Sequence, residues 1–401
     1  MNDEHPAPKA NRDQLLFYGM LIYLLACSCF FICPLLIFGR TTLPALLFPV
    51  YFIVLLLVLT TFNRTVPLRW MLCCFVFGAT IVPLLTLLIS KPVANLLDAD
   101  STAFYAVIVP LLEETIKVLP LLVLLLLPRW RYRWTAGATD LLVLGAALGA
   151  GFTFYEDTLH ILAGNFSLDQ IISMHSGAPH LGPIYFFPNM DVKVFSGVGW
   201  RRDASGAVAA FIGHGGATAF IGLTIGLVRL LGVRIKKALG SLGIILWVIP
   251  LAVWFWMVLD HGMFNYADDI GGLPTLLRIL YLLDGYGRLS SFVLYLLVLV
   301  TIGLERWVLW RVRWHTVSLR LSKERLGLLS EALKNPLTIP LHLLALRSFL
   351  RERRGLSYGV FTYHQAGRQN QAQRTYLEKL ARALLSWKSS LEVSPSTPAS
   401  S

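Results

Sequence analysis

Long apolar runs dominate the sequence, and eight of them are about as long as a helix that crosses a bilayer. Such a helix needs about 20 predominantly apolar residues. Only 14% of the residues are charged, whereas charged residues make up about a quarter of an ordinary soluble domain. We therefore predict an all-α polytopic membrane bundle of about eight transmembrane helices within residues 15–310. The runs lie near 15–38, 43–62, 69–90, 102–127, 140–163, 206–231, 242–266 and 288–310.

Basic residues concentrate in alternate connections between these runs and in the segment after the last one. Arg129, Arg131 and Arg133 follow the fourth run, for example, while the connection after the third has Lys91 beside two aspartates. The positive-inside rule then places both termini in the cytoplasm.

The same reasoning divides the rest of the chain. Residues 1–14 are predicted to be a cytoplasmic N-terminus, and residues 311–388 a basic cytoplasmic tail. The tail alternates leucine with basic residues, which predicts amphipathic helices against anionic lipid. The final segment, 389–401, is predicted to be disordered. No nucleic-acid-binding motif is present, so we expect no nucleic-acid partner.

The fourth run carries three charges, in the sequence PLLEETIKVLP. A charged side chain inside a span costs several kcal/mol and is seldom kept without a role. Glu113 and Lys117 are four residues apart and share a helix face, so an ion pair explains them. Glu114 points about 100° away and needs another partner, which favours a functional motif.

The fifth run holds Glu156, with Phe152 one turn before it on the same face. Gly145 and Gly149 upstream have the spacing of small residues that lets membrane helices approach closely. We expect that approach to bring Glu156 near the side chains of neighbouring helices.

Histidines occur in the sixth and seventh runs. His214 lies among glycines, and His261 shares a face with Asn265, four residues later. A lone buried histidine is more often a satisfied core residue than a ligand. Two of them in a chain that also has three intramembrane glutamates favour a shared site.

Carboxylates and imidazoles facing one cavity are suited to activating water. A glutamate accepts a proton from water, histidine and glutamate together hold zinc, and an amide side chain stabilises an oxyanion. The short HExxH zinc motif is absent, so a metal site must be assembled from separate helices. The same residue types also make proton relays, so a proton-coupled transporter and a noncatalytic membrane-binding scaffold are the alternatives.

Four motifs in order resemble the PrsW family of intramembrane proteases, within the superfamily of CAAX-type prenyl endopeptidases and bacterial immunity proteins. Glu113–Lys117 is similar to the EExxK motif and Phe152–Glu156 to FxxxE. His214 matches the third-motif histidine, and His261 with Asn265 resembles HxxxN. The resemblance covers about residues 100–266.

This resemblance implies a membrane-embedded endopeptidase that cuts a membrane-tethered protein, such as an anti-sigma factor, in the bacterial cytoplasmic membrane. The catalytic residues that it implies are Glu113, Glu114, Glu156, His214, His261 and Asn265, with Lys117 and Phe152 in support. The glutamates would activate water, the histidines would bind metal or polarise the carbonyl, and Asn265 would assist at the oxyanion. The candidate ligands of a zinc ion are Glu114, Glu156, His214 and His261, and a purely glutamate-based mechanism is the alternative.

Overall fold

A computed structural model describes most of the chain between Pro49 and Glu392. The first predicted span, 15–38, lies outside the described residues except for Gly19, and so do the residues after 392. The described residues are 19, 46, 49–100, 103–126, 135–162, 200–202, 208–269, 275–284, 288–312, 339–365 and 371–392.

Five described helices are long and apolar enough to cross a bilayer. This confirms an integral membrane helical bundle, whereas the total of eight spans remains a prediction. The five stretches lie in α2 (Leu68–Leu96), α6 (Ala138–Leu162), α9 (Gly213–Leu239), α10 (Val248–Asp269) with the end of the preceding 3-10 helix, and α12 (Arg288–Arg311). The 3-10 helix η2 (Gly240–Trp247) joins α9 to α10.

Two other predicted spans are helical without belonging to the five. Residues 43–62 contain a shorter apolar helix, Pro49–Thr60. Residues 102–127 form the π-helix η1 (Phe104–Ile108), which runs directly into α4 (Val109–Leu126). The three charged residues of α4 set it apart from a purely apolar span.

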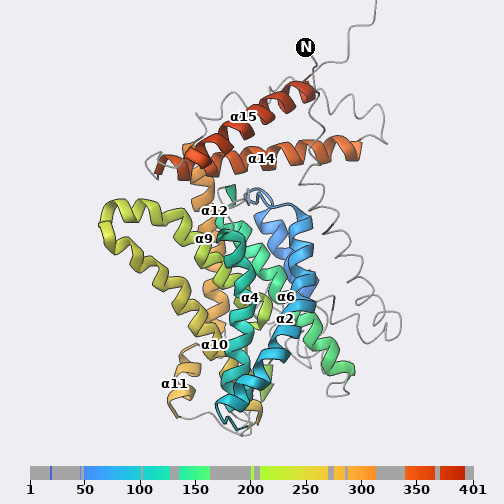
Figure 1. The fold of residues 1–401 in the computed structure, drawn as a ribbon, viewed down its shortest axis with the longest axis vertical. Coiled ribbons are helices and arrows are strands. Elements are labelled where there is room, and N and C mark those ends of the chain that lie inside the picture. The colour runs from blue at the N-terminus through green and yellow to red at the C-terminus, as the bar shows by residue number, and fades with distance from the viewer. Residues whose placement is uncertain are drawn as a thin grey trace, which may run out of the picture.

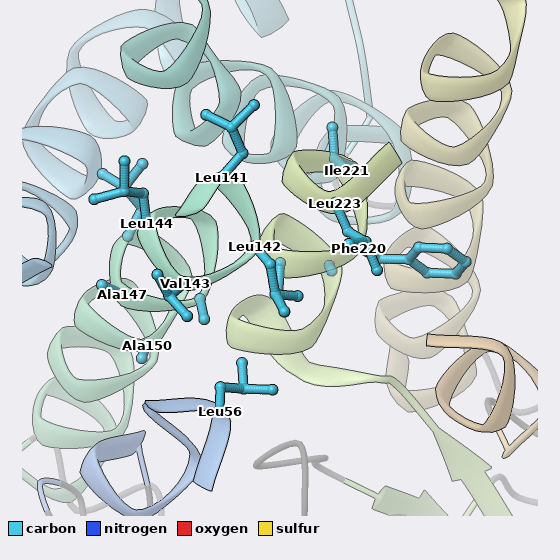
Figure 2. Close-up of a cluster of buried hydrophobic side chains, with 14 of the residues drawn as sticks. Leu56, Leu141, Leu142, Val143, Leu144, Ala147, Ala150, Phe220, Ile221 and Leu223 are labelled. Atoms are coloured by element: carbon cyan, nitrogen blue, oxygen red, sulfur yellow. The ribbon is translucent and has the colours of Figure 1, made fainter. Parts of the chain in front are cut away.

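Helix α6 is the centre of the bundle. The consecutive residues Leu141–Leu144 are all fully buried, so this helix is covered around its whole circumference, as expected of a helix that is apolar on all sides. Figure 2 shows these side chains together with Phe220 and Ile221 of α9 and with Leu56. By contrast, Leu87 of α2 and Leu299 of α12 are exposed, and these outer faces are suited to lipid.

Small residues set the distance between α6 and α9. A Cβ atom at Gly145 would overlap the backbone carbonyl of Thr218, and one at Gly149 would overlap the carbonyl of His214. The two helix backbones therefore touch, as the spacing of these glycines predicts. Because of this contact, the start of α9 lies beside the second half of α6.

A short antiparallel pair of strands interrupts this predominantly helical chain. Strands β1 (Trp200–Arg202) and β2 (Val208–Ala210) pair with Trp200 opposite Ala210. The expected span at 206–231 is therefore wrong at its start, since α9 begins only at Gly213. Gly213, the first residue of α9, has a φ of 78°, a conformation open to glycine because it lacks a Cβ.

The described part of the basic tail contains two helices, α14 (Ile339–Gln365) and α15 (Gln371–Glu392). They pack on each other through a small buried cluster that includes Phe349 and Leu377. In Figure 1 they lie across one end of the bundle, and α11 (Thr275–Leu283) lies at the other end. Contact of the tail with a lipid leaflet remains a prediction.

Two fully buried carboxylates, with the donors around them, form what we call the carboxylate anchor at the tail end of the bundle. Asp140, in the first turn of α6, accepts hydrogen bonds from the backbone amides of Thr65, Val66 and Gly137 at 2.7–2.8 Å and from the Thr65 hydroxyl at 2.6 Å. A negative charge at this helix end is also favoured by the helix dipole.

Glu305 of α12 is the second carboxylate of the anchor. Its oxygens accept hydrogen bonds from the Thr139 amide (3.0 Å), the Thr139 hydroxyl (2.7 Å) and Asn63 Nδ2 (3.1 Å). Tyr358 of α14 is buried here and donates from its hydroxyl to the Asn63 carbonyl at 3.4 Å. The anchor therefore joins α6, α12 and the first tail helix.

Candidate active site

Helices α4, α6, α9 and α10 bring every site residue proposed from the sequence into one cluster. Glu114 of α4 is at its centre and is fully buried. Its Oε1 lies 3.3 Å from His214 Nδ1 and 3.2 Å from His261 Nδ1. One carboxylate oxygen therefore faces imidazoles from two different helices.

Lys117 contacts the same oxygen, in addition to the pairing with Glu113 expected on the helix face. Its Nζ is 2.7 Å from Glu114 Oε1 but 3.8 Å from Glu113 Oε2. The spacing of three residues also places Lys117 beside Glu114, and the two imidazoles draw Glu114 into the cluster. Lys117 Nζ also lies 2.6 Å from His214 Nδ1 and 4.3 Å from the centre of the Phe152 ring.

Glu113 faces the cluster from one side. Its buried Oε2 is 3.9 Å from His261 Nδ1 and has no hydrogen bond to any residue that the structure describes. The Oε2 atom of Glu114 is likewise buried without a hydrogen bond. Burying a carboxylate oxygen without a donor costs free energy. These two atoms are therefore suited to contact a cation, a water molecule or a substrate group.

Glu156 of α6 forms the edge of the site. Its Oε2 lies 2.7 Å from His214 Nε2, and its side chain is 37% exposed. His214 is thus held at both ring nitrogens, by Glu114 on one side and Glu156 on the other. Glu156 is also the site carboxylate most open to the surroundings.

A break in the fourth predicted span positions Asn265. In the π-helical register of η1, the Tyr105 carbonyl would accept a bond from the amide of residue 110, but Pro110 has no N–H. Asn265 Nδ2 donates to this carbonyl at 3.0 Å and lies 3.4 Å from His261 Nε2. Pro110 therefore leaves the Tyr105 carbonyl without this backbone donor, and the bond from Asn265 to that carbonyl holds Asn265 beside His261.

Two further residues shape the site, and sequence reasoning left them without a site role. Phe211 stacks on the ring of His261, with centroids 4.7 Å apart and planes 15° apart, and meets His214 edge-on at 5.2 Å. Asp260 is fully buried and accepts a 3.4 Å hydrogen bond from the amide of Ile212, just before α9. Phe211 is an apolar residue in an apolar run, so the sequence gives no sign of its ring contacts. Asp260 is a charged residue in an apolar run next to His261, and that could have marked it.

The cluster is suited to a divalent cation. Glu113, Glu114, His214 and His261 are all buried, and one ligand atom from each lies within 4.8 Å of the others. Two imidazoles and two carboxylates are a donor set that zinc accepts. This group contains Glu113, whereas the ligand set expected from the sequence has Glu156 in that place.

Comparison with known proteins gives one match. A family model described as PrsW family intramembrane metalloprotease matches residues 66–302, more than half of the chain. No curated protein and no solved structure matches. The matched region contains α4, α6, α9 and α10 and all the residues of the cluster. The chain therefore belongs to the PrsW family of intramembrane metalloproteases.

Proposed function

We propose that this intramembrane protease cuts a membrane-tethered protein at the cluster around Glu114, with water as the nucleophile. The observation that carries the proposal is the buried group of two glutamates and two histidines, whose ligand atoms lie within 4.8 Å of one another. Residues of this kind are expensive within membrane helices, and three separate helices contribute them to one point.

Glu114, His214 and His261 would hold the metal ion, with zinc as the candidate, and Glu113 beside them would serve proton transfer. When bound, such an ion acts as a Lewis acid that polarises a peptide carbonyl and makes water more acidic. Lys117 Nζ contacts Glu114 Oε1 and His214 Nδ1. These atoms thus already surround a positive group, and Lys117 must move away from them when a metal ion binds.

Glu113 is our candidate for the proton carrier, because its Oε2 is buried without a hydrogen bond. It would accept a proton from the attacking water and later deliver a proton to the leaving amide nitrogen. Glu114, which faces both imidazoles, would instead remain ionised within the cluster. A glutamate that serves both steps is sufficient for the hydrolysis of one peptide bond.

Glu156 and Asn265 would orient the histidines. Glu156 contacts the ring nitrogen of His214 that points away from Glu114, an arrangement typical of the carboxylates that support metal-binding histidines. Asn265 Nδ2 is occupied by the Tyr105 carbonyl. We therefore assign Asn265 to holding His261 in place and not to the oxyanion role that the family resemblance implies.

The substrate and setting follow from the sequence arguments. We propose a regulatory protein such as an anti-sigma factor as the substrate, and the bacterial cytoplasmic membrane as the location. With both termini in the cytoplasm, the cluster would lie in the outer half of the bilayer, and the basic tail would face anionic lipid. The partial exposure of Glu156 supports entry of water and substrate at that edge.

The test uses the full-length protein in lipid nanodiscs with a membrane-tethered anti-sigma-type substrate. Cleavage is followed by gel analysis and mass spectrometry, and bound metal by elemental analysis. Glu114→Gln and His214→Ala are expected to stop cleavage and reduce metal content while the protein remains folded. Glu378→Gln changes an exposed glutamate of α15 in the same way and should behave as wild type. Normal cleavage by both site variants would reject the proposed mechanism.

A further inference from the structure

Helix α14 turns a basic face toward the helical bundle. Arg347, Arg351 and Arg354 are spaced by four and three residues, so they share one side of the helix. Tyr358, one turn beyond Arg354, is buried and reaches the Asn63 carbonyl. Arg354 itself donates from Nε and Nη2 to the Arg64 carbonyl at 3.3 and 3.1 Å. This side of the helix therefore contacts the loop before α2.

Arg64, in that loop, adds a fourth guanidinium group to the same place. It is only 5% exposed. Among the described residues its side chain has one hydrogen bond, from Nη1 to the sulfur of Met71 at 3.5 Å, and sulfur is a weak acceptor. Burial and the nearby positive charges of Arg347, Arg351 and Arg354 together lower the pKa of Arg64 to about 10, although Asp140 acts in the opposite direction.

The acidic groups near these arginines are already engaged. Asp140 accepts four hydrogen bonds from the backbone and the hydroxyl in the carboxylate anchor. Glu352 pairs with Arg351 at 3.3 Å. Even so, Arg351 Nε is buried and has no hydrogen bond to the part of the chain that the structure describes. Four guanidinium groups thus face two occupied carboxylates, which leaves an excess of positive charge and at least one unused donor.

An anion between these side chains would offset the repulsion and use the unpaired donors. Guanidinium groups bind phosphate well because their planar forks donate two parallel hydrogen bonds. We propose that Arg64, Arg347 and Arg351 form a phosphate-binding site between the loop before α2 and helix α14, with Arg354 holding the loop in position. The site lies outside the proteolytic cluster, and the proposal does not depend on cleavage.

The phosphate can belong to a lipid headgroup or to a soluble compound. Arg64 is four residues before the start of α2, which is a candidate span. Headgroups lie at the ends of membrane helices, so a phospholipid can reach the site from the side. A soluble phosphate compound would enter from the water that surrounds the tail.

The experiment measures binding to the full-length protein in nanodiscs. One probe is inorganic phosphate, followed by the shift in melting temperature. The other is phosphatidylglycerol compared with phosphatidylcholine, followed by native mass spectrometry. Arg347→Gln combined with Arg351→Gln is expected to weaken binding at least about tenfold, because two forked donors are lost. Arg374→Gln removes a single charge from an exposed position on α15 and should change binding less than about twofold.

The two probes separate the sources. Loss of phosphatidylglycerol binding alone assigns the site to a lipid headgroup, loss of inorganic phosphate binding alone assigns it to a soluble compound, and loss of both supports a shared phosphate site. Arg351→Lys keeps the charge without the fork and should give a smaller loss, which guards against a folding defect in the double variant. Equal binding by wild type and the double variant, or an equal loss in Arg374→Gln, would overturn the proposal.

Discussion

Buried carboxylates lie beside both ends of helix α6, and their surroundings differ. At the tail end, the oxygens of Asp140 and Glu305 are met by amide and hydroxyl donors at 2.6–3.1 Å. At the other end, Glu113 and Glu114 face imidazoles and an ammonium group, and each has one buried oxygen without a hydrogen bond.

This difference separates a structural carboxylate from a reactive one. Neutral donors that surround a carboxylate compensate its burial and leave nothing free to bind. Side chains that can gain or lose protons, with spare oxygens between them, leave room for an ion, a water molecule and a substrate. Both clusters are buried, so burial does not distinguish them. The difference lies in their partners, which are neutral donors in one and ionisable side chains in the other.

The strongest test of the comparison is to remove Glu114. Glu114→Ala should lower the rate of substrate cleavage by about 10³-fold, in the range reported for the loss of acid–base and electrostatic groups. The melting temperature in detergent should fall less than in Asp140→Ala, because Lys117 can still pair with Glu113, 3.8 Å away. A variant that fails to fold would show that Glu114 is a structural carboxylate like Asp140.

Metal removal gives the next largest effect. Incubation with 1,10-phenanthroline should abolish most cleavage, and added zinc should restore it, as expected if buried glutamates and histidines hold the ion. Asp140→Asn is the matched control, and its remaining activity should respond to the chelator as wild type does. Cleavage that persists after elemental analysis shows no bound metal would instead support a glutamate mechanism.

Asp140→Ala probes the other end of α6. It removes a buried carboxylate that accepts four hydrogen bonds, so the free energy of unfolding should fall by about 3 kcal/mol. Activity per folded molecule should remain close to wild type, because Glu156 and the histidines are far away. Chemical denaturation measures the free energy of unfolding, and a cleavage assay normalised to folded protein measures the activity. A large fall in activity at unchanged stability would contradict the comparison.

Gly149→Ala connects packing to the site. The new methyl group would overlap the His214 carbonyl, so α9 must move away from α6 and carry His214 with it. We expect cleavage to fall about tenfold and stability by 1–3 kcal/mol, the usual cost of overpacking. Gly303→Ala in α12 meets no atom within 4 Å and should leave both the melting temperature and the cleavage rate unchanged.

The smallest effect is expected at Phe211. Phe211→Leu keeps an apolar side chain but removes the stacked contact with His261 and the edge contact with His214, each worth about 0.5–1.5 kcal/mol. The catalytic rate should fall several-fold while the KM for the substrate stays nearly constant. A rise in KM without a change in rate would mean that Phe211 contacts substrate and does not position the histidines.

Much of this architecture can be predicted from the sequence, because lipid imposes simple rules. Apolar runs of about 20 residues predict spanning helices, and costly polar groups within them mark the cluster. Glu113, Glu114, Glu156, His214 and His261 stand out for that reason. Their positions in the structure are adjacent, while their chemical roles remain proposals.

Other features depend on contacts that no local pattern encodes. Lys117 lies closer to Glu114 than to Glu113, and two histidines from distant helices meet Glu114 at the same oxygen. Strand β2 falls inside an apolar run, and three residues are too few to show a strand period. Phe211 resembles any other apolar residue until His261 packs against it.

Helix α6 also imposes an angular relationship on the molecule. Asp140 and Glu156 are sixteen residues apart on one uninterrupted helix, about 24 Å along its axis. Inserting one residue between them would turn Glu156 by about 100° away from His214, although no atom of either cluster had been altered. The number of residues between Asp140 and Glu156 therefore fixes the direction of Glu156 relative to the end of α6 that contacts the tail.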